Sequence, residues 1–129
     1  VGVLETLLQK TVEYSKTRKQ FGTVIGTFQA LQHRMADMFI ECQLARSIVV
    51  MAAMKLDSSA DQREKTKAVS AAKSRVGKAI RRVSQEAVQI HGGIGVTNEL
   101  DVGHYFKRAT ALEIMFGNTD YHVERFASL

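Results

Sequence analysis

The chain has 129 residues, a net charge of +5, no proline and a single cysteine. This length suits one domain that buries roughly two thirds of its unfolded surface, and no apolar run approaches the roughly 20 residues needed to cross a bilayer. The basic residues are spread over several segments, which argues against a nucleic-acid-binding tract, and a lone thiol excludes an internal disulfide.

The single cysteine, Cys42, has no Cys or His partner at ligand spacing, so we predict no metal site. The chain has neither an initiator Met nor a signal-peptide pattern. We therefore expect a cytoplasmic protein without a membrane span, and we treat residues 1–129 as one domain that can be a fragment of a longer polypeptide.

The first predicted helix runs from Val1 to about Arg18. Its apolar residues share one side at helical spacing, and they are Val3, Leu4, Leu7, Leu8, Val12 and Tyr14. The helix leads into a loop over residues 17–27 that holds two glycines and an exposed-looking Phe21. Loops of this kind carry binding sites more often than helix cores do.

The second helix has the clearest pattern, because its apolar residues repeat with alternating steps of three and four. The repeat comprises Phe28, Leu31, Met35, Met38, Cys42, Ala45, Val49, Ala52 and Leu56. We expect Thr27 to cap this helix and the polar turn at residues 57–59 to end it. A third helix follows, whose small apolar residues allow close approach of its neighbours: Ala68, Ala72, Val76, Ala79, Val83, Ala87 and Ile90.

Three glycines within four residues, Gly92, Gly93 and Gly95, break the third helix. Glycine tolerates positive φ and lets another group approach the backbone closely. The break is therefore either a helix C-cap and turn or a backbone cradle for a ligand.

Beyond the break, we expect a turn or a short helix start at residues 97–99 and a short element around Tyr105 and Phe106. The segment 109–116 is apolar enough to enter a core. An interruption at residues 117–120 precedes a last helix, whose apolar residues are Tyr121, Val123, Phe126 and Leu129.

No stretch of useful length alternates with period two, so we predict no sheet. Antiparallel helices joined by short polar turns, one of them with a heptad seam, predict an all-α fold. The architecture we expect is an antiparallel four-helix-type bundle with short extra helices.

Two short segments carry residue types suited to an anionic ligand with a planar ring. Arg18, Gln20 and Phe21 supply a guanidinium, an amide and an aromatic face. The plain alternative is an Arg at a helix end, where the helix dipole favours cations. The side chain of Gln89 and the backbone of the glycine break can likewise donate to an anion, although a helix cap explains the glycines equally well.

Other conspicuous polar residues receive a structural interpretation. His91 has no carboxylate or nucleophile beside it, so we expect a structural rather than a catalytic role. Arg81 and Arg82 point to different sides of one helix, so we assign both to the surface.

Three motifs occur together in a specific order and spacing. They are Arg-Lys-Gln-Phe-Gly at 18–22, Phe-Gln at 28–29 with Met-Ala-Asp-Met at 35–38, and Ala-Val-Gln-Ile-His-Gly-Gly-Ile-Gly at 87–95. With them, the chain resembles the C-terminal helical domain of acyl-CoA dehydrogenases from about Gly2 to its end.

The resemblance implies an oxidoreductase that binds FAD and an acyl-CoA thioester. In this family a carboxylate removes the α-proton of the thioester, and the β-hydrogen leaves as hydride to the flavin, which later passes electrons to an acceptor. The helical domain makes dimer and tetramer contacts and reaches the flavin of a neighbouring subunit. A homo-oligomer or a hetero-oligomer is therefore implied.

The resemblance also implies, by motif match, which residues contact FAD. The residues assigned to the diphosphate and adenosine part are Arg18, Gln20, Phe21 and Phe28, and those assigned to the glycine turn are Gln89, Ile90, Gly92 and Gly93. The turn at Asn118 and Thr119 is suited to the flavin. The physical sense is that Arg neutralises diphosphate charge while glycines let main-chain N–H groups come within hydrogen-bond range.

The chain departs from the family where many members carry Glu-Gly-Thr, with that Glu as the base. Phe116 occupies the position of the Glu, and a phenyl ring cannot accept a proton. Asp120 lies one helical turn further on, too displaced to be assumed a substitute.

Three explanations stay open: a base in sequence that precedes this chain, a non-catalytic subunit paired with an active one, or different flavin chemistry on the same scaffold. We expect the isolated domain to be inactive. A cofactor-free basic helical interaction module is the rival from another class, with the heptad seam and the charge as its support.

Overall fold

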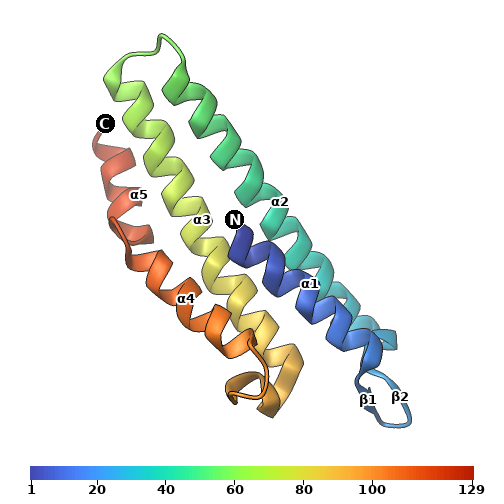
Figure 1. Ribbon diagram of the computed structural model, residues 1–129. Helices are drawn as coiled ribbons and strands as arrows, with labels where there is room; N and C mark the ends of the chain where they lie inside the picture. Colours follow the sequence, from blue (N-terminus) through green and yellow to red (C-terminus); the bar gives the residue numbers. More distant parts are fainter.

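The computed structural model describes all residues 1–129 and shows a bundle of α-helices (Figure 1). The helices are α1 (Gly2–Thr17), α2 (Gln29–Asp57), α3 (Gln62–His91), α4 (Val102–Ile114) and α5 (Thr119–Ser128). Successive helices α1 to α4 run antiparallel, and α5 continues in the direction of α4 along the far half of α3 (Figure 1). The predicted all-α bundle is confirmed.

The central helix is α3, which contacts α1, α2, α4 and α5. Its small residues make this possible, since Ala79 and Ala87 are fully buried. At Gly77 the approach is closest, because an added Cβ would collide with the hydroxyl of Thr119 on α5. The small-residue pattern predicted for the third helix therefore serves helix packing.

The main core lies between α1, α2, α3 and α4, and its largest fully buried side chains include Leu4, Leu7, Met38 and Val83. A smaller cluster lies between the C-terminal part of α2 and the N-terminal part of α3, where α1 no longer covers these helices. It contains Ala52, Ala68 and Ala72, with Ile48 packed against it.

The heptad seam of α2 is confirmed at Met38, Cys42, Ala45 and Ala52, which are all buried. It is wrong at Val49 and Leu56, which are both exposed, and Ile48 takes the inward position instead of Val49. A straight helix drifts by about 20° per heptad relative to a 3.5-residue repeat. At this end of α2, moreover, α1 no longer lies alongside, so fewer apolar positions have a partner.

The prediction of no sheet is wrong in one detail, because β1 (Lys19–Gln20) and β2 (Thr23–Val24) form an antiparallel hairpin. Two-residue strands are too short to show an alternating pattern. Phe21 and Gly22 form the turn with φ of 56° and 79°, as in the type I′ turn that suits two-residue hairpins.

The predicted cap of the second helix is also wrong, because the N-cap is Phe28. The Thr27 hydroxyl instead donates to the Val24 carbonyl at 2.8 Å and closes the 3-10 turn η1 (Ile25–Thr27). At the other break, a second 3-10 segment, η2 (Gly92–Val96), follows α3 directly.

The C-terminal third differs most from expectation. Residues 97–99 form a bend, as the turn alternative predicted, and the two elements expected around 105–106 and 109–116 are one helix, α4, which ends at Ile114. The apolar segment 109–116 contributes to the core only as far as Leu112. Ile114, Met115 and Phe116 are exposed at the end of α4 and in the turn that follows. Helix α5 forms as predicted, but it buries Thr119 and His122 and leaves its larger apolar side chains, Tyr121, Val123 and Phe126, exposed.

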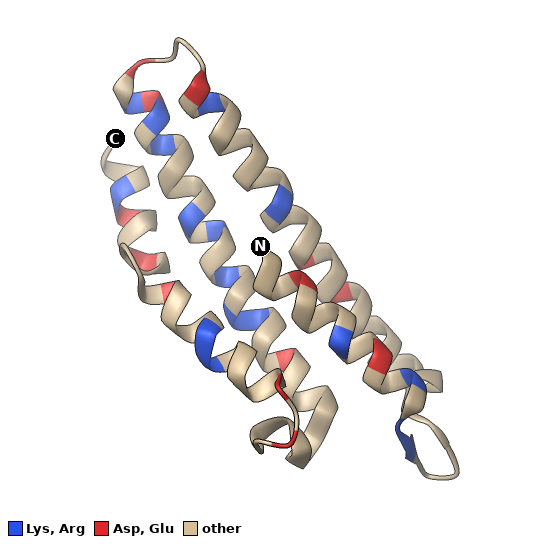
Figure 2. Cartoon of the chain, viewed as in Figure 1, with Lys and Arg blue, Asp and Glu red and all other residues tan.

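Charged residues lie along all the long helices, and the Lys and Arg residues of α3 are spaced over its first two thirds, residues 63–82 (Figure 2). Arg82 pairs with Asp37 at 2.7 Å and Arg81 lies 3.6 Å from Glu113, so the two adjacent arginines reach α2 and α4 respectively. Both are exposed, as predicted. None of the helices combines the length and apolarity that a membrane crossing requires.

Candidate functional site

A cleft of about 540 Å³ lies where the end of α1, the hairpin, the start of α2 and the end of α3 meet. Eight of the ten predicted FAD-contacting residues line it: Arg18, Gln20, Phe21, Phe28, Gln89, Ile90, Gly92 and Gly93. Two motifs far apart in the sequence thus form one site. The remaining lining residues are Tyr14, Ile25, Leu31, Arg34, His91 and Ile94.

The hairpin forms one wall of the cleft. Phe21 stands at its tip with 91% of its surface exposed and a positive φ of 56°. Its ring meets Phe28 edge-on, with ring centroids 6.1 Å apart. A non-glycine residue in the left-handed region costs of order 1–3 kcal/mol, and such strain concentrates at functional sites. The turn therefore holds a large aromatic face away from the core of the bundle.

The end of α3 forms the opposite wall. Gly92 has φ of 67°, and its N–H donates to the carbonyls of Gln89 and Val88, so it is a helix C-cap. A Cβ built on Gly92 or Gly93 would meet no atom within 4 Å, which leaves both backbones accessible from the cleft. The two interpretations of the glycine break are thus compatible.

Gly95 has a different role from its neighbours. An added Cβ there would lie 2.9 Å from the Cβ of His91 and 3.0 Å from the Val88 carbonyl oxygen. Its absence lets the chain fold back tightly against the end of α3.

His91 is buried in the wall of the cleft. Its ring stacks on Tyr14 with centroids 4.3 Å apart, and its Nδ1 lies 2.7 Å from the Ala87 carbonyl oxygen. Burial lowers the pKa of His91, while the bond to Ala87 acts in the opposite direction. The structural role expected for His91 fits these contacts.

The charges at the cleft are cationic and only partly neutralised. Arg34 forms an ion pair with Glu86, whereas Arg18 makes no ion pair and remains exposed. No carboxylate lines the cleft. The sequence interpretation missed Arg34, and the available signal was its place three residues after Leu31, at the edge of the apolar face of α2.

The other two predicted residues, Asn118 and Thr119, do not line the cleft; they lie in the turn between α4 and α5. The Asn118 side chain accepts the Tyr121 N–H at 2.9 Å and caps α5. Thr119 is buried, and both its N–H and its hydroxyl donate to Oε1 of Glu113, at 3.1 Å and 2.9 Å. These bonds hold the pKa of Glu113 below its ordinary value, although burial opposes them.

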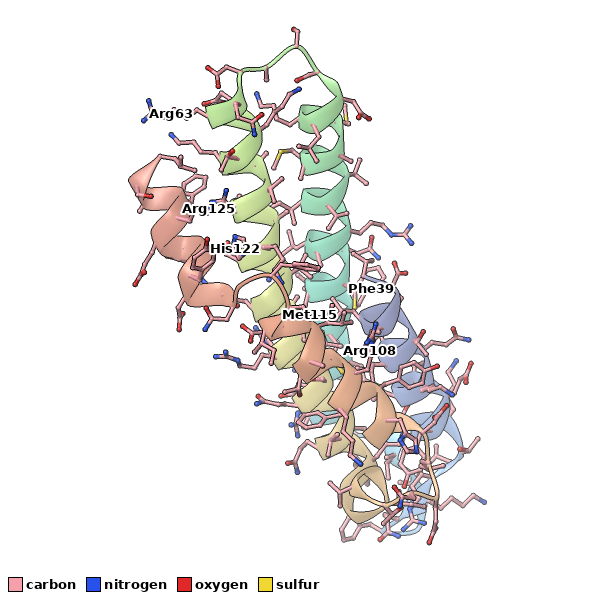
Figure 3. All side chains as sticks on the ribbon, turned by 60° about the vertical axis from the view of Figure 1, so that its left-hand side comes forward. Phe39, Arg63, Arg108, Met115, His122 and Arg125 are labelled. Carbon is pink, nitrogen blue, oxygen red and sulfur yellow. The ribbon has the colours of Figure 1, made fainter.

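Further contacts fix the backbone of this turn. Lys73 donates to the Met115 carbonyl at 2.8 Å, and Nε2 of His122 bonds the Phe116 carbonyl at 3.0 Å. Met115 and His122 lie on either side of the turn (Figure 3). Phe116 has φ of 60° and is 88% exposed, so this turn also presents an aromatic side chain on a strained backbone.

Two carboxylates lie near the turn, and neither stands at the sequence position of the missing Glu. Glu113 is engaged by Thr119, and Asp120 is exposed in the first turn of α5. The structure therefore leaves the expectation about Phe116 unchanged.

Comparisons with known proteins identify the family. A family model described as acyl-CoA dehydrogenase, C-terminal domain, matches residues 1–128. The chain is 45% identical over 109 residues to acyl-CoA dehydrogenase IpdE2 of Mycolicibacterium smegmatis. The matched region covers 84% of this chain and 32% of the relative. The chain therefore spans about a third of the length of that relative.

Two solved structures share the fold over nearly the whole chain. One is an FAD-dependent dehydrogenase, with 29% identity, a TM-score of 0.90 and coverage of 98% of this chain and 34% of that one. The other is the ChsE4-ChsE5 complex from Mycobacterium tuberculosis, with 34% identity, a TM-score of 0.91 and coverage of 98% and 34%. The chain therefore belongs to the acyl-CoA dehydrogenase family and corresponds to its C-terminal domain.

Proposed function

We propose that this chain is the C-terminal domain of an FAD-dependent acyl-CoA dehydrogenase and that its cleft contacts FAD. The observation that carries the proposal is the meeting of two distant motifs, at 18–22 and 87–95, in one cleft of about 540 Å³. The similar FAD-dependent dehydrogenase supports the choice of cofactor. The activity proposed for the whole protein is α,β-dehydrogenation of an acyl-CoA thioester in the cytoplasm.

The residues of the cleft fit a dinucleotide cofactor. Arg18 is an unpaired guanidinium that can bind a diphosphate, and the exposed ring of Phe21 offers a face for a planar ring. The accessible backbones of Gly92 and Gly93 allow close approach of the ligand. When bound, FAD supplies the hydride acceptor, and this domain supplies charge and orientation.

The α4–α5 turn contributes to the proposal separately from the cleft. The Thr119 N–H and hydroxyl both already donate to Glu113, so a proposed hydrogen bond to the flavin has to be one that Thr119 accepts. Asn118 is exposed, and it remains the better candidate of the two.

The outer face of α2 supports an oligomer. Large apolar side chains are exposed along it, at Phe39, Ile40, Leu44, Val50, Met51 and Met54. Contiguous exposed apolar surface marks protein interfaces in soluble proteins. We propose that this face contacts another subunit.

A second candidate function is that of a non-catalytic subunit in a hetero-oligomeric acyl-CoA dehydrogenase. The observation that favours it is Phe116, an exposed residue that takes, by the motif match, the position of the catalytic Glu of many family members. A similar structure is the ChsE4-ChsE5 complex, which has two differently named components. In this case the proton acceptor belongs to the partner subunit, and the isolated domain is inactive under either candidate.

FAD retention by the full-length protein tests the assignment of the cleft. Arg18→Ala is expected to weaken FAD binding roughly 10- to 100-fold, because a charged hydrogen bond contributes about 1.5–3 kcal/mol. Lys19→Ala is the matched control, since Lys19 is exposed nearby but does not line the cleft. Equal FAD retention in the two variants would count against the proposal.

Anaerobic mixing with a panel of acyl-CoA thioesters separates the two candidates. Bleaching of the flavin in the purified protein indicates a base within its own chain. Bleaching that requires an added partner subunit indicates the non-catalytic role. A protein that never takes up FAD contradicts both.

A further inference from the structure

The His91 ring forms the wall between two cavities. It lines the cleft of about 540 Å³ and also a second cavity of about 250 Å³ beside α1 and the connection from α3 to α4. Tyr14 lines both cavities as well and stacks on the ring. The ring is therefore fixed in place, and the residue lines the cleft where we place the anionic ligand.

The contacts of the ring fix its tautomer. Nδ1 lies 2.7 Å from the Ala87 carbonyl oxygen, which only accepts, so Nδ1 carries a proton. In the neutral ring Nε2 then holds a lone pair, and it has no hydrogen-bond partner in the protein. Because His91 lines the cleft, a proton added at Nε2 would bring a positive charge to its wall.

The charges around His91 come from α1, α2, α3 and the segments next to them. Lys10 and Glu13 on α1 and Arg18 directly after it are near, and Lys10 is neutralised at 2.9 Å by Asp101, which precedes α4. From α2, Arg34 is paired with Glu86 on α3 itself. The unpaired cation on the cleft side is Arg18, so without a bound anion nothing at the cleft favours a second positive charge.

In the free protein, the surroundings of His91 therefore favour the neutral ring. Burial lowers its pKa from the ordinary 6.5, and Lys10 acts in the same direction. The Ala87 carbonyl and Asp101 oppose this effect without reversing it.

We propose that His91 takes up a proton when a diphosphate-bearing ligand enters the cleft, so that binding of the anion and protonation of His91 are coupled. The inference rests on the proposed function, because it places a diphosphate in this cleft. An opposite charge within about 4–6 Å of an imidazole favours its charged form. The bound anion thus reverses the effect of burial.

Linkage gives the sign and the size of the effect. Protonation of His91 contributes fully to affinity below the pKa of the free protein, and the contribution is lost as the pH rises through the higher pKa of the complex. Each unit by which the anion raises this pKa strengthens binding at low pH about tenfold relative to high pH.

Calorimetry on the flavin-free, full-length protein tests the coupling. ADP-ribose is the probe, because its diphosphate is esterified at both ends and does not titrate near neutral pH. Titrations at about pH 6 and about pH 8, each in two buffers of different ionisation enthalpy, report both affinity and proton uptake. We expect about tenfold tighter binding at the lower pH, accompanied by net uptake of protons.

The variants assign this effect to His91. His91→Gln is expected to bind ADP-ribose with the same affinity at both pH values and without proton uptake, and His91→Asn is a second neutral replacement if the first does not fold. The control is His104→Gln, since His104 is exposed on α4 and lines neither cavity. It should behave like the unmodified protein.

The outcomes separate this inference from the proposed function. Binding that Arg18→Ala weakens but that shows no proton uptake would overturn the coupling and leave the cleft assignment intact. Proton uptake that persists in His91→Gln would also overturn it. No binding of ADP-ribose at either pH would contradict the proposed function, and the coupling with it.

Discussion

The contact between α3 and α5 at Gly77 gives the sharpest test of the fold. Ala is favoured over Gly inside a helix by about 1 kcal/mol, so Gly77→Ala would stabilise an isolated α3. In the bundle, the new methyl group collides with the hydroxyl of Thr119, which donates to the Glu113 carboxylate. The substitution therefore places helix propensity against tertiary packing.

The magnitudes favour packing. Displacing the Thr119 hydroxyl breaks its hydrogen bond to the charged Glu113 carboxylate, which costs about 1.5–3 kcal/mol of stability. Overpacking by the new methyl group costs about 1–3 kcal/mol more. After the propensity gain, we expect Gly77→Ala to lower the free energy of unfolding by about 2–5 kcal/mol. Urea unfolding of residues 1–129, followed by circular dichroism, measures it.

A double-mutant cycle identifies the cause. Thr119→Ala removes the hydroxyl, and the next nearest atom to the new methyl group, the Thr119 Cβ, lies 3.5 Å away. In this background we expect Gly77→Ala to be neutral or to stabilise by up to about 1 kcal/mol. The reasoning fails if Gly77→Ala stabilises the unmodified chain, or if its penalty is as large without the hydroxyl.

Two further predictions concern the α4–α5 turn and the outer face of α2. In the folded chain the pKa of Glu113 lies below its ordinary value of 4.5, chiefly because the Thr119 N–H donates to its carboxylate. The ionised carboxylate therefore stabilises the fold above pH 4.5. This stabilisation is lost as the pH falls through the folded-state pKa. Unfolding measured across this range should depend less on pH in Glu113→Gln; equal pH dependence would refute the assignment. Met54 is 69% exposed on the face of α2 that we propose contacts another subunit. An unpaired charge buried in an interface costs several kcal/mol, so Met54→Glu should raise the dissociation constant of the full-length oligomer at least about tenfold. Sedimentation velocity measures this, with Gln62→Glu on exposed α3 surface as the control, and an unchanged Met54→Glu oligomer would exclude this face.

The long helices could be predicted from sequence because their signals are local. The apolar spacing on α1, the inner half of α2 and α3 reports which side of each helix meets a core. The errors lie where a partner is missing or a strand is too short. Val49 and Leu56 follow the repeat but lie in the part of α2 that α1 does not accompany (Figure 1). Phe116 is apolar yet exposed in the turn between α4 and α5, where its φ is 60°.

The candidate site was partly predictable for a related reason. Arg18, Phe21 and Gly92 stand out as residue types in loops and at helix ends, where sequence signals are strong. Arg34 was missed because its only signal, a position at the edge of the apolar face of α2, does not distinguish a ligand contact from a surface ion pair. Asn118 and Thr119, which the sequence analysis assigned to the flavin, lie in a turn separate from the cleft, where they contact Tyr121 and Glu113.

By itself, the sequence determined the helical class, the small-residue face of α3 and the two motifs that indicate the family, because each depends on residues close together in the chain. Only the tertiary structure decided that Arg18 and Gly92 share one cleft, and that the Gly92 cap keeps its backbone accessible from it. It also decided that His91 faces two cavities with Nε2 free of partners. These contacts bring the end of α1 next to the end of α3. They arise from the packing of the helices against one another, which no local sequence pattern encodes.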